Sequence, residues 1–268
     1  ANLGDDALVY ALRESEVKTI LCASKAVKKL QGLCEKNGIS LDLVIATEHE
    51  GNAPTPQGQT PKVVDFEAVI DAGNGQPEPD SLPTKTSDDG LIMYTSGTTG
   101  DPKGVVLTQG NILAAVKGLD NHLQAFLHFA EEDTSYCAYL PLSHILEFAA
   151  ENVMLKNGFL LGYCNPRTLT NTSARPHGDL QEYKPILLAG VPRIYDTIKK
   201  AVEAKLPAEG TLKRKLFDRA FEERREALKR GLDTSFYNSK IFAAPAAALG
   251  GRVKCIISGG APLSAQTQ

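Results

Sequence analysis

Short, mostly apolar runs alternate with amphipathic stretches along this sequence, and that alternation most narrows the folds open to it. The runs at 17–22 and 41–46 have the length of buried strands. Between them, residues 24–35 place their apolar side chains on one helical face. A strand–helix–strand order of this length favours parallel strands crossed by a helix. The sequence therefore predicts an α/β fold of layered, mostly parallel sheets flanked by helices.

The same alternation continues toward the C-terminal end. Further strands are expected at 91–94, 104–108, 135–140, 159–163, 186–190 and 252–257. Further helices are expected at 7–13, 111–129, 145–155, 192–204, 212–230 and 239–249. Ser24 is expected to cap the helix at 24–35. Pro192 is expected at the first helical position, where its missing N–H costs no hydrogen bond.

Residues 47–90 have a different composition. They contain six of the 15 prolines and only one short amphipathic piece, at 63–70. Such a stretch predicts a variable, loop-rich surface excursion rather than a site of chemistry.

Composition excludes several classes of protein. The 268 residues carry 29 Lys and Arg against 32 Asp and Glu, so the net charge of -3 gives no global argument for nucleic-acid binding. No apolar run approaches the ~18–20 residues of a spanning helix. Five cysteines without a C-x-x-C pair are typical of reduced thiols in an intracellular protein. The five histidines form no metal-ligand spacing with them, so no metal site is predicted.

Both ends suggest a piece of a longer chain. Residue 1 is Ala rather than Met. Ser264 has the position of a helix N-cap, but only four residues follow it. A cap without its helix predicts truncation; a frayed C-terminal tail is the alternative.

The most informative segment is YTSGTTGDPKG, residues 94–104, between two expected strands. Residues 95–99 contain four hydroxyl side chains and one glycine. Gly97 and Gly100 let the backbone approach a ligand, and successive inward N–H groups form an anion-binding concavity. Lys103 adds a mobile positive charge. The segment thus suits a polyphosphate; a Ser/Thr/Gly-rich hairpin turn is the structural alternative.

This segment is not a Walker A loop. That motif, G-x-x-x-x-G-K-[ST], has a second glycine five residues after the first and then opens a helix, whereas five residues after Gly97 comes Pro102. The segment instead runs into the expected strand 104–108. It must bind phosphate through its own amides, hydroxyls and lysine rather than through a helix N-terminus.

The string YTSGTTGDPKGV resembles the nucleotide-phosphate signature of adenylate-forming enzymes, the AMP-binding superfamily. Three other segments resemble, in the expected order, segments of its long-chain fatty-acid–CoA ligases or of the superfamily. They are YLPLSHILE at 139–147, AGVPRIY at 189–195 and SGGAPLS at 258–264. The resemblance covers essentially the whole chain, with 47–90 weakest. It implies that residues 1–268 are an incomplete AMP-binding domain, part of the large N-terminal domain of such an enzyme.

The resemblance implies activation of a fatty acid in two steps. The carboxylate attacks the α-phosphate of ATP, bound with Mg²⁺, and gives an acyl-adenylate and pyrophosphate. The thiol of CoA then attacks the acyl carbon and AMP leaves. The expected partners are fatty acid, ATP and CoA, without nucleic acid. The expected location is intracellular, cytoplasmic or peripheral on a membrane such as endoplasmic reticulum or peroxisome.

The resemblance also implies site residues. Those that would hold the β- and γ-phosphates are Thr95, Ser96, Gly97, Thr98, Thr99, Gly100 and Lys103. Lys103 and Thr98 are assigned to catalysis, with Lys103 favouring the departing pyrophosphate.

A second implied set would form the acyl and adenylate pocket. Its members are His144, Val191, Pro192, Arg193, Gly259, Gly260, Ala261 and Pro262. Each has a structural alternative: His144 as a satisfied strand-end histidine, 191–193 as a helix start, and 259–262 as a plain turn. Glu147, one helical turn from His144, is either a charge near a helix N-terminus or a site residue.

Residues 213–230 contain eight Lys or Arg and four Asp or Glu. Leu216, Phe217, Ala220, Phe221 and Leu228 fall on one helical face. This pattern favours a helix packed on the core with a solvated basic face. Attachment to an anionic membrane surface is the alternative.

Two other functions stay open. The acid could be a different one, such as an aryl, amino or shorter acyl substrate. The chain could also be a nucleotide-binding fragment without turnover. The family's later segments, Y-G-x-T-E, the ribose-binding Asp and the C-terminal lysine, are absent from the 268 residues.

Overall fold

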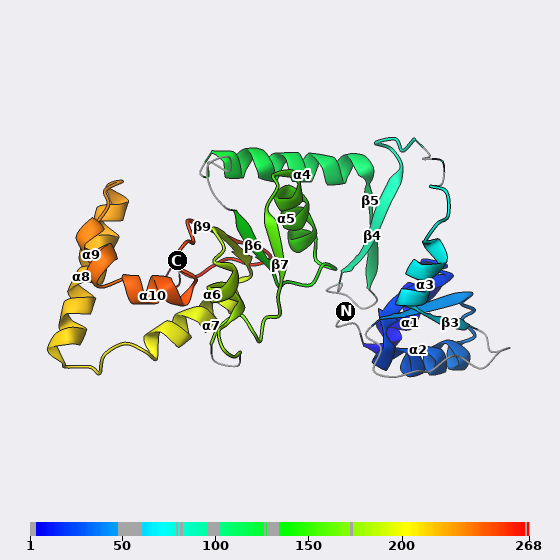
Figure 1. Cartoon of the computed structure of the whole chain (residues 1–268), viewed down its shortest axis with the longest axis horizontal. Coiled ribbons are helices and arrows are strands. Elements are labelled where there is room, and N and C mark those ends of the chain that lie inside the picture. Colours follow the sequence, from blue (N-terminus) through cyan, green and yellow to red (C-terminus); the bar gives the residue numbers. More distant parts are fainter. Residues whose placement is uncertain are drawn as a thin grey trace. The chain divides into compact units, whose positions relative to one another are not determined.

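A computed structural model describes residues 4–47, 61–78, 80, 83–95, 102–125, 127, 134–171, 174–265 and 267. The chain divides into two compact units, Ala1–Asn111 and Ile112–Gln268. Each unit has its own strands and its own buried core (Figure 1).

The first unit contains a parallel sheet of three strands. Their order is β1 (Thr19–Ala23), β2 (Leu43–Thr47) and β3 (Lys62–Asp65). Helices α1 (Asp5–Glu14), α2 (Ser24–Asn37) and α3 (Phe66–Gly73) accompany these strands. The core of this unit consists of Leu12, Leu30, Cys34, Leu41 and Val44. These residues come from α1, α2 and the β2 region, which confirms the predicted strand–helix–strand unit.

An antiparallel hairpin completes the first unit. It pairs β4 (Asp89–Thr95) with β5 (Lys103–Thr108). Both strands were expected at these positions, and their closeness in sequence allows the antiparallel pairing. The Tyr94 hydroxyl donates to the carbonyl of Ala11 at 3.2 Å, which ties the hairpin to α1.

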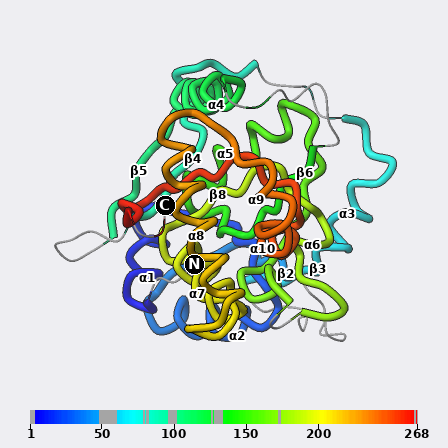
Figure 2. The backbone as a smooth tube through the Cα atoms, turned by 90° about the vertical axis from the view of Figure 1, so that its left-hand side faces the viewer, coloured from blue at the N-terminus to red at the C-terminus, as the bar shows by residue number. Residues whose placement is uncertain are grey.

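The second unit contains a parallel sheet of four strands. Their order is β7 (Leu160–Tyr163), β6 (Ser135–Ala138), β8 (Leu187–Gly190) and β9 (Cys255–Ser258). Figure 2 follows the backbone of these elements from the side. Helix α5 (Ile145–Lys156) connects β6 to β7, while α6 (Asp179–Tyr183) precedes β8 and α7 (Pro192–Glu203) follows it. The parallel sheet between helices confirms the predicted α/β class.

Alternate residues of the central strands enter two different cores. Tyr136 and Leu187 pack with residues of α5 and of α4 (Gln109–Gln124) in one cluster. Cys137 and Leu188 pack with residues of α6 and α7 in the other. Because successive strand residues point to opposite faces, helices cover both faces of this sheet.

The last helices differ from the prediction. Instead of one helix at 239–249, the chain forms α9 (Ser235–Lys240) and α10 (Ala243–Ala248). Pro245 explains the break, because its ring nitrogen cannot donate to the carbonyl four residues earlier, that of Ile241.

The expectation of a core-packed helix at 212–230 is wrong for most of its apolar face. Helix α8 (Leu212–Lys229) buries only Ala220. Leu216, Phe221 and Leu228 are 54%, 52% and 55% exposed.

The structure differs from the prediction in several smaller details. Strand β3 lies inside the stretch expected to be loop-rich, and α6 was not expected. Strand β9 begins at Cys255 rather than at residue 252. Ser24 is the first residue of α2, and its hydroxyl donates to the carbonyl of Thr47 at 2.7 Å instead of capping the helix.

All five cysteines are free thiols; Cys34 and Cys137 are buried, and the other three are partly exposed. Among the helices of the described residues, none has both the length and the apolarity needed to cross a membrane.

Two neighbouring glycines after α10 generate a stability test. Gly250 and Gly251 both have positive φ, +88° and +76°. A Cβ on Gly250 would overlap the Leu180 carbonyl oxygen and lie 2.8 Å from the Lys184 Cα. A Cβ on Gly251 would meet only the Ala247 Cα, at 4.0 Å.

Gly250→Ala should therefore destabilise the second unit by about 3 kcal/mol, because it adds a backbone clash to the unfavourable φ. Gly251→Ala, the matched control, should lose only about 1 kcal/mol from φ. Urea unfolding followed by circular dichroism measures both. Equal losses would contradict the close approach at Gly250.

Candidate functional site

The described residues of the predicted pocket meet at one edge of the second sheet. Strands β6, β8 and β9 are parallel and end at Ala138, Gly190 and Ser258. His144 follows the first of these ends, residues 191–193 follow the second, and residues 259–262 follow the third. The carboxyl edge of an α/β sheet is where such folds place their ligands.

Direct contacts join the second and third of these segments. The Gly259 N–H donates to the Gly190 carbonyl at 3.0 Å. A Cβ on Gly260, whose φ is +78°, would lie 3.6 Å from the Val191 side chain. A Cβ on Gly259 would lie 3.1 Å from the Leu146 side chain. The glycine turn thus lies against both the start of α7 and the first turn of α5.

Two tyrosines position the end of β8. The Tyr139 hydroxyl donates to the Ala189 carbonyl at 2.6 Å, and the Tyr195 hydroxyl donates to the Ile257 carbonyl at 2.6 Å. A Cβ on Gly190 would lie 2.6 Å from the first hydroxyl and 2.9 Å from the second. Glycine is therefore needed at 190. Residue-by-residue reasoning missed these roles, although both tyrosines lie inside the quoted motif segments.

His144 begins helix α5 through its backbone. Its carbonyl accepts from the N–H groups of Glu147 and Phe148 at 3.1 and 3.2 Å. Its imidazole makes no capping hydrogen bond, and the residue is exposed. Arg193 is exposed as well.

A groove of about 1100 Å³ begins at the glycine turn. We call it the edge groove. Ala261 and Pro262 line one part of it, and residues of α7, α8 and β9 line most of the rest, together with Leu206, Glu209, Leu263 and Thr267. Its apolar lining includes Ile198, Val202, Leu206, Phe217, Phe221 and Ile256. Val191, Pro192 and Arg193 are not among its lining residues.

The predicted phosphate loop is described only at its two ends. Thr95 and Lys103 face each other across the hairpin as Cα partners, and both are exposed. Ser96, Gly97, Thr98, Thr99 and Gly100 lie outside the described residues. Thr95 and Lys103 belong to the first unit, and the pocket residues belong to the second.

Glu147 is completely buried beside this edge. The Tyr136 hydroxyl of β6 donates to its Oε2 at 2.9 Å. Its Oε1 accepts no hydrogen bond from the described residues. The carboxyl thus lies in the core beneath the start of α5, not at the solvated end of the helix.

Burial raises the pKa of the Glu147 carboxyl to about 7, more than the Tyr136 hydrogen bond lowers it. The neighbouring charge of Glu151 acts in the same direction as burial. Burial also raises the pKa of Glu151 itself.

The described residues contain no group of three or more His, Cys, Asp and Glu side chains able to hold a metal ion.

The buried carboxyl makes stability depend on pH. The pKa of Glu147 rises from 4.5 to about 7 on folding, so the folded state holds this proton over a range where the unfolded state releases it. The protonated carboxyl's contribution to the stability of the folded state is complete below about pH 4.5 and disappears as the pH rises through about 7.

Glu147→Gln keeps the acceptor for Tyr136 but cannot titrate. The free energy of unfolding of this variant, relative to that of the wild type, should rise by on the order of 3 kcal/mol between pH 4 and pH 8. Urea unfolding at both pH values measures the difference. A difference between the two proteins that does not change with pH would contradict a raised pKa at Glu147.

Comparison with known proteins places the chain in a family. The sequence profile described as "AMP-binding enzyme" matches residues 1–268. Long-chain-fatty-acid–CoA ligase 2 of Schizosaccharomyces pombe is 35% identical over 99% of this chain and 39% of its own length. Long chain acyl-CoA synthetase 8 of Arabidopsis thaliana is 33% identical over 100% of this chain and 38% of its own length. The chain thus spans about two fifths of these relatives.

Solved structures share the fold. The adenylation domain of a carboxylate reductase from Mycobacterium chelonae matches 99% of this chain and 39% of its own, with a TM-score of 0.67 and 17% identity. A didomain of a carboxylic acid reductase from Segniliparus rugosus, solved with AMP, matches with a TM-score of 0.68, covering 99% of this chain and 35% of its own at 18% identity. At these identities the likeness concerns the fold alone. By the profile that matches it from end to end, the chain belongs to the family of AMP-binding enzymes.

Proposed function

We propose that this chain, as part of a full-length enzyme, takes part in the ATP-dependent conversion of a long-chain fatty acid to its CoA thioester through an acyl-adenylate. The observation that carries this proposal is the 35% identity, over 99% of the chain, to a protein named a long-chain-fatty-acid–CoA ligase. The convergence of three motif segments at one sheet edge supports it.

Phosphate binding is assigned to the hairpin of the first unit. Lys103 lies across from Thr95 at the base of the loop, so its ammonium can reach an anion bound by the loop amides. Thr95, Ser96, Gly97, Thr98, Thr99 and Gly100 would hold the β- and γ-phosphates of ATP. Lys103 and Thr98 would stabilise the charge that develops as pyrophosphate leaves.

Binding of the acid and the adenylate is assigned to the carboxyl edge of the second unit. Gly259, Gly260, Ala261 and Pro262 present little side-chain bulk, which leaves room for a flat ring. His144, Val191, Pro192 and Arg193 would border the same space. The edge groove has a volume of about 1100 Å³, which is large enough for a long acyl chain. Its lining combines apolar side chains with five charged ones, those of Lys199, Glu203, Glu209, Arg214 and Asp218.

In this reaction the main tasks of the protein are to position the reactants and to stabilise the charge that develops on the phosphate oxygens. A fatty-acid carboxylate is ionised at neutral pH, so its attack on the α-phosphate needs no general base. Mg²⁺ would arrive on the ATP phosphates, and CoA would complete the second step as co-substrate.

The proposed location is intracellular, cytoplasmic or peripheral on a membrane such as endoplasmic reticulum or peroxisome. One supporting observation is that a relative from Arabidopsis thaliana, 31% identical, is named a peroxisomal long chain acyl-CoA synthetase.

Lys103→Ala in the full-length protein tests the phosphate assignment. Loss of its charge should lower the rate of ATP–pyrophosphate exchange by about 10²-fold. Lys25→Ala, at an exposed lysine of α2, is the matched control and should leave the rate unchanged. Exchange at the wild-type rate in the Lys103 variant would remove the assignment.

Product analysis tests the acid. The full-length protein with ATP, Mg²⁺, CoA and palmitate should form AMP and palmitoyl-CoA, and benzoate or an amino acid should not replace palmitate. The 268-residue chain alone should form neither product, because it spans only 39% of its relative's length. A preference for benzoate or an amino acid would favour the alternative of a ligase for another acid. Turnover by the chain alone would show that it is self-sufficient.

A further inference from the structure

Helices α8 and α9 form a hairpin in which the chain reverses direction (Figure 1). Gly231 follows the end of α8 with a φ of +68°, and its N–H donates to the Leu228 carbonyl at 3.0 Å. The Leu232 N–H donates to the Ala227 carbonyl at 3.0 Å, which completes a Schellman motif. The backbone of the turn between the two helices is thus fixed by its own hydrogen bonds.

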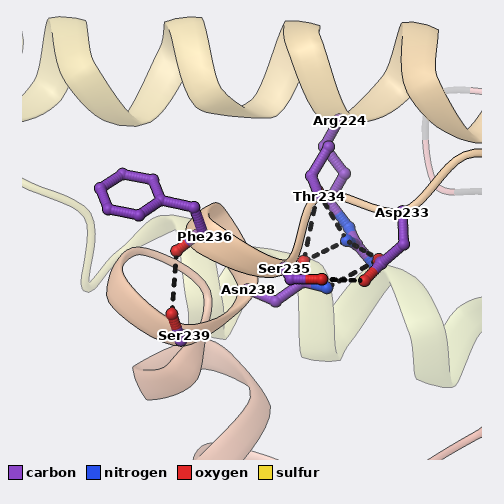
Figure 3. A network of polar contacts seen from close by, with 7 residues as sticks. All are labelled: Arg224, Asp233, Thr234, Ser235, Phe236, Asn238 and Ser239. Carbon is purple, nitrogen blue, oxygen red and sulfur yellow. Dashed lines mark hydrogen bonds and ion pairs between the residues drawn. The ribbon is translucent and has the colours of Figure 1, made fainter.

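A network of polar contacts joins the two helices at this turn (Figure 3). The Arg224 guanidinium of α8 donates to the Thr234 hydroxyl at 2.9 Å and also bonds Asn238 of α9. The Asn238 amide donates to the Asp233 carboxylate at 2.8 Å, and the Ser235 hydroxyl donates to the same carboxylate at 2.9 Å. Because these contacts come from both helices and from the turn, they fix the position of the turn on the hairpin.

The turn leaves three large apolar side chains in contact with solvent. Leu228, Leu232 and Phe236 are 55%, 58% and 69% exposed. Figure 3 shows the Phe236 ring pointing away from the polar network. We call residues 228–236 the hairpin tip. The edge groove extends along α8 only to Phe221, so the tip is not part of the candidate site. Several exposed apolar side chains within one ordered turn are typical of a contact surface.

The hairpin is basic, although the chain as a whole has a negative net charge. Residues 212–240 contain nine Lys or Arg and five Asp or Glu, a local charge of +4 in a chain with a net charge of -3. All five of these carboxylates form ion pairs within the hairpin, with N–O distances of 2.7 to 3.4 Å. The basic residues that form no ion pair with a described residue are Lys213, Lys215, Arg230 and Lys240. The charge that the hairpin presents to a partner is therefore positive.

We propose that the hairpin tip docks on an anionic membrane surface, with Leu232 and Phe236 entering the boundary between the headgroups and the acyl chains. Apolar side chains enter that boundary without a complementary cleft, which suits residues exposed on a turn. The unpaired basic residues of the hairpin attract the anionic headgroups. The proposed location leaves open which residues meet a membrane, and this assignment of the contact does not depend on the proposed activity.

Vesicle sedimentation tests the docking. The 268-residue chain should bind vesicles of phosphatidylcholine and phosphatidylserine, and should bind vesicles of phosphatidylcholine alone about tenfold more weakly. Leu232→Ser/Phe236→Ser should weaken binding to the anionic vesicles about tenfold, because it removes the side chains that enter the bilayer. Both residues are exposed, so circular dichroism should show an unchanged fold.

The matched control is Leu155→Ser/Leu160→Ser. These two leucines are 61% and 63% exposed and lie outside the hairpin, so the variant removes apolar surface of the same kind without weakening binding. Arg230→Glu should also weaken binding to the anionic vesicles. Lys117→Glu makes the same change of charge at an exposed residue of α4 and should bind as the wild type does.

A single tryptophan locates the contact, because the sequence contains none of its own. The fluorescence of Phe236→Trp should shift to shorter wavelength when anionic vesicles are added, and lipids brominated on their acyl chains should quench it. Phe66→Trp, at an exposed phenylalanine of α3 in the first unit, should show neither change.

Three results would overturn the proposal. The first is an absence of binding to the anionic vesicles, or equal binding by the two double-serine variants. The second is vesicle binding that leaves the fluorescence of Phe236→Trp unchanged. The third is sedimentation of the 268-residue chain with anionic vesicles but not of the full-length protein, because the rest of the enzyme would then cover the tip.

Discussion

The second unit depends on strand β8, which pairs with β6 on one side and β9 on the other and is buried along its whole length. Leu187 and Ala189 join the core under α4 and α5, and Leu188 joins the core under α6 and α7. Neither helical layer can therefore bury its apolar face without this strand. A polar side chain at any of these positions would be buried without a hydrogen-bonding partner, which would destabilise the core that it enters.

The end of the same strand builds the candidate site. Gly190 has two tyrosine hydroxyls where a side chain would begin, and its carbonyl accepts the Gly259 N–H. Backbone atoms and small residues form the edge itself, and the side chains of Tyr139 and Tyr195 pack beneath it.

The carboxylates of the second unit lie in two different environments. Glu147 is buried and accepts a hydrogen bond from Tyr136, and burial is the main cause of its raised pKa. On α8, by contrast, carboxylates form ion pairs on the helix surface, such as Arg214 with Asp218 and Arg219 with Glu223. Such exposed pairs add little stability. Helix α8 also has the buried Ala220, the ring contact of Phe217 with Phe242, and the hydrogen bond from Arg224 to Thr234.

Strands with long apolar runs could be predicted, because burial on both faces requires nearly every residue to be apolar. Strand β3 could not, since only Val63 and Val64 separate its two charged ends and prolines and glycines surround the stretch. The break between α9 and α10 could have been predicted from Pro245. The exposure of Leu216 and Phe221 could not, because a helical pattern shows which residues share a face but not whether another element covers that face.

The sequence by itself determined the α/β class, the two strands on either side of the predicted phosphate loop and the membership in the AMP-binding enzymes. These follow from local periodicity and from motifs, which are properties of neighbouring residues. Only the tertiary structure decided that residues as distant as Val191 and Gly260 touch, that Glu147 is buried, and that Leu232 and Phe236 are exposed at the turn between α8 and α9. Those features depend on strand order and helix packing, which join segments far apart in the chain.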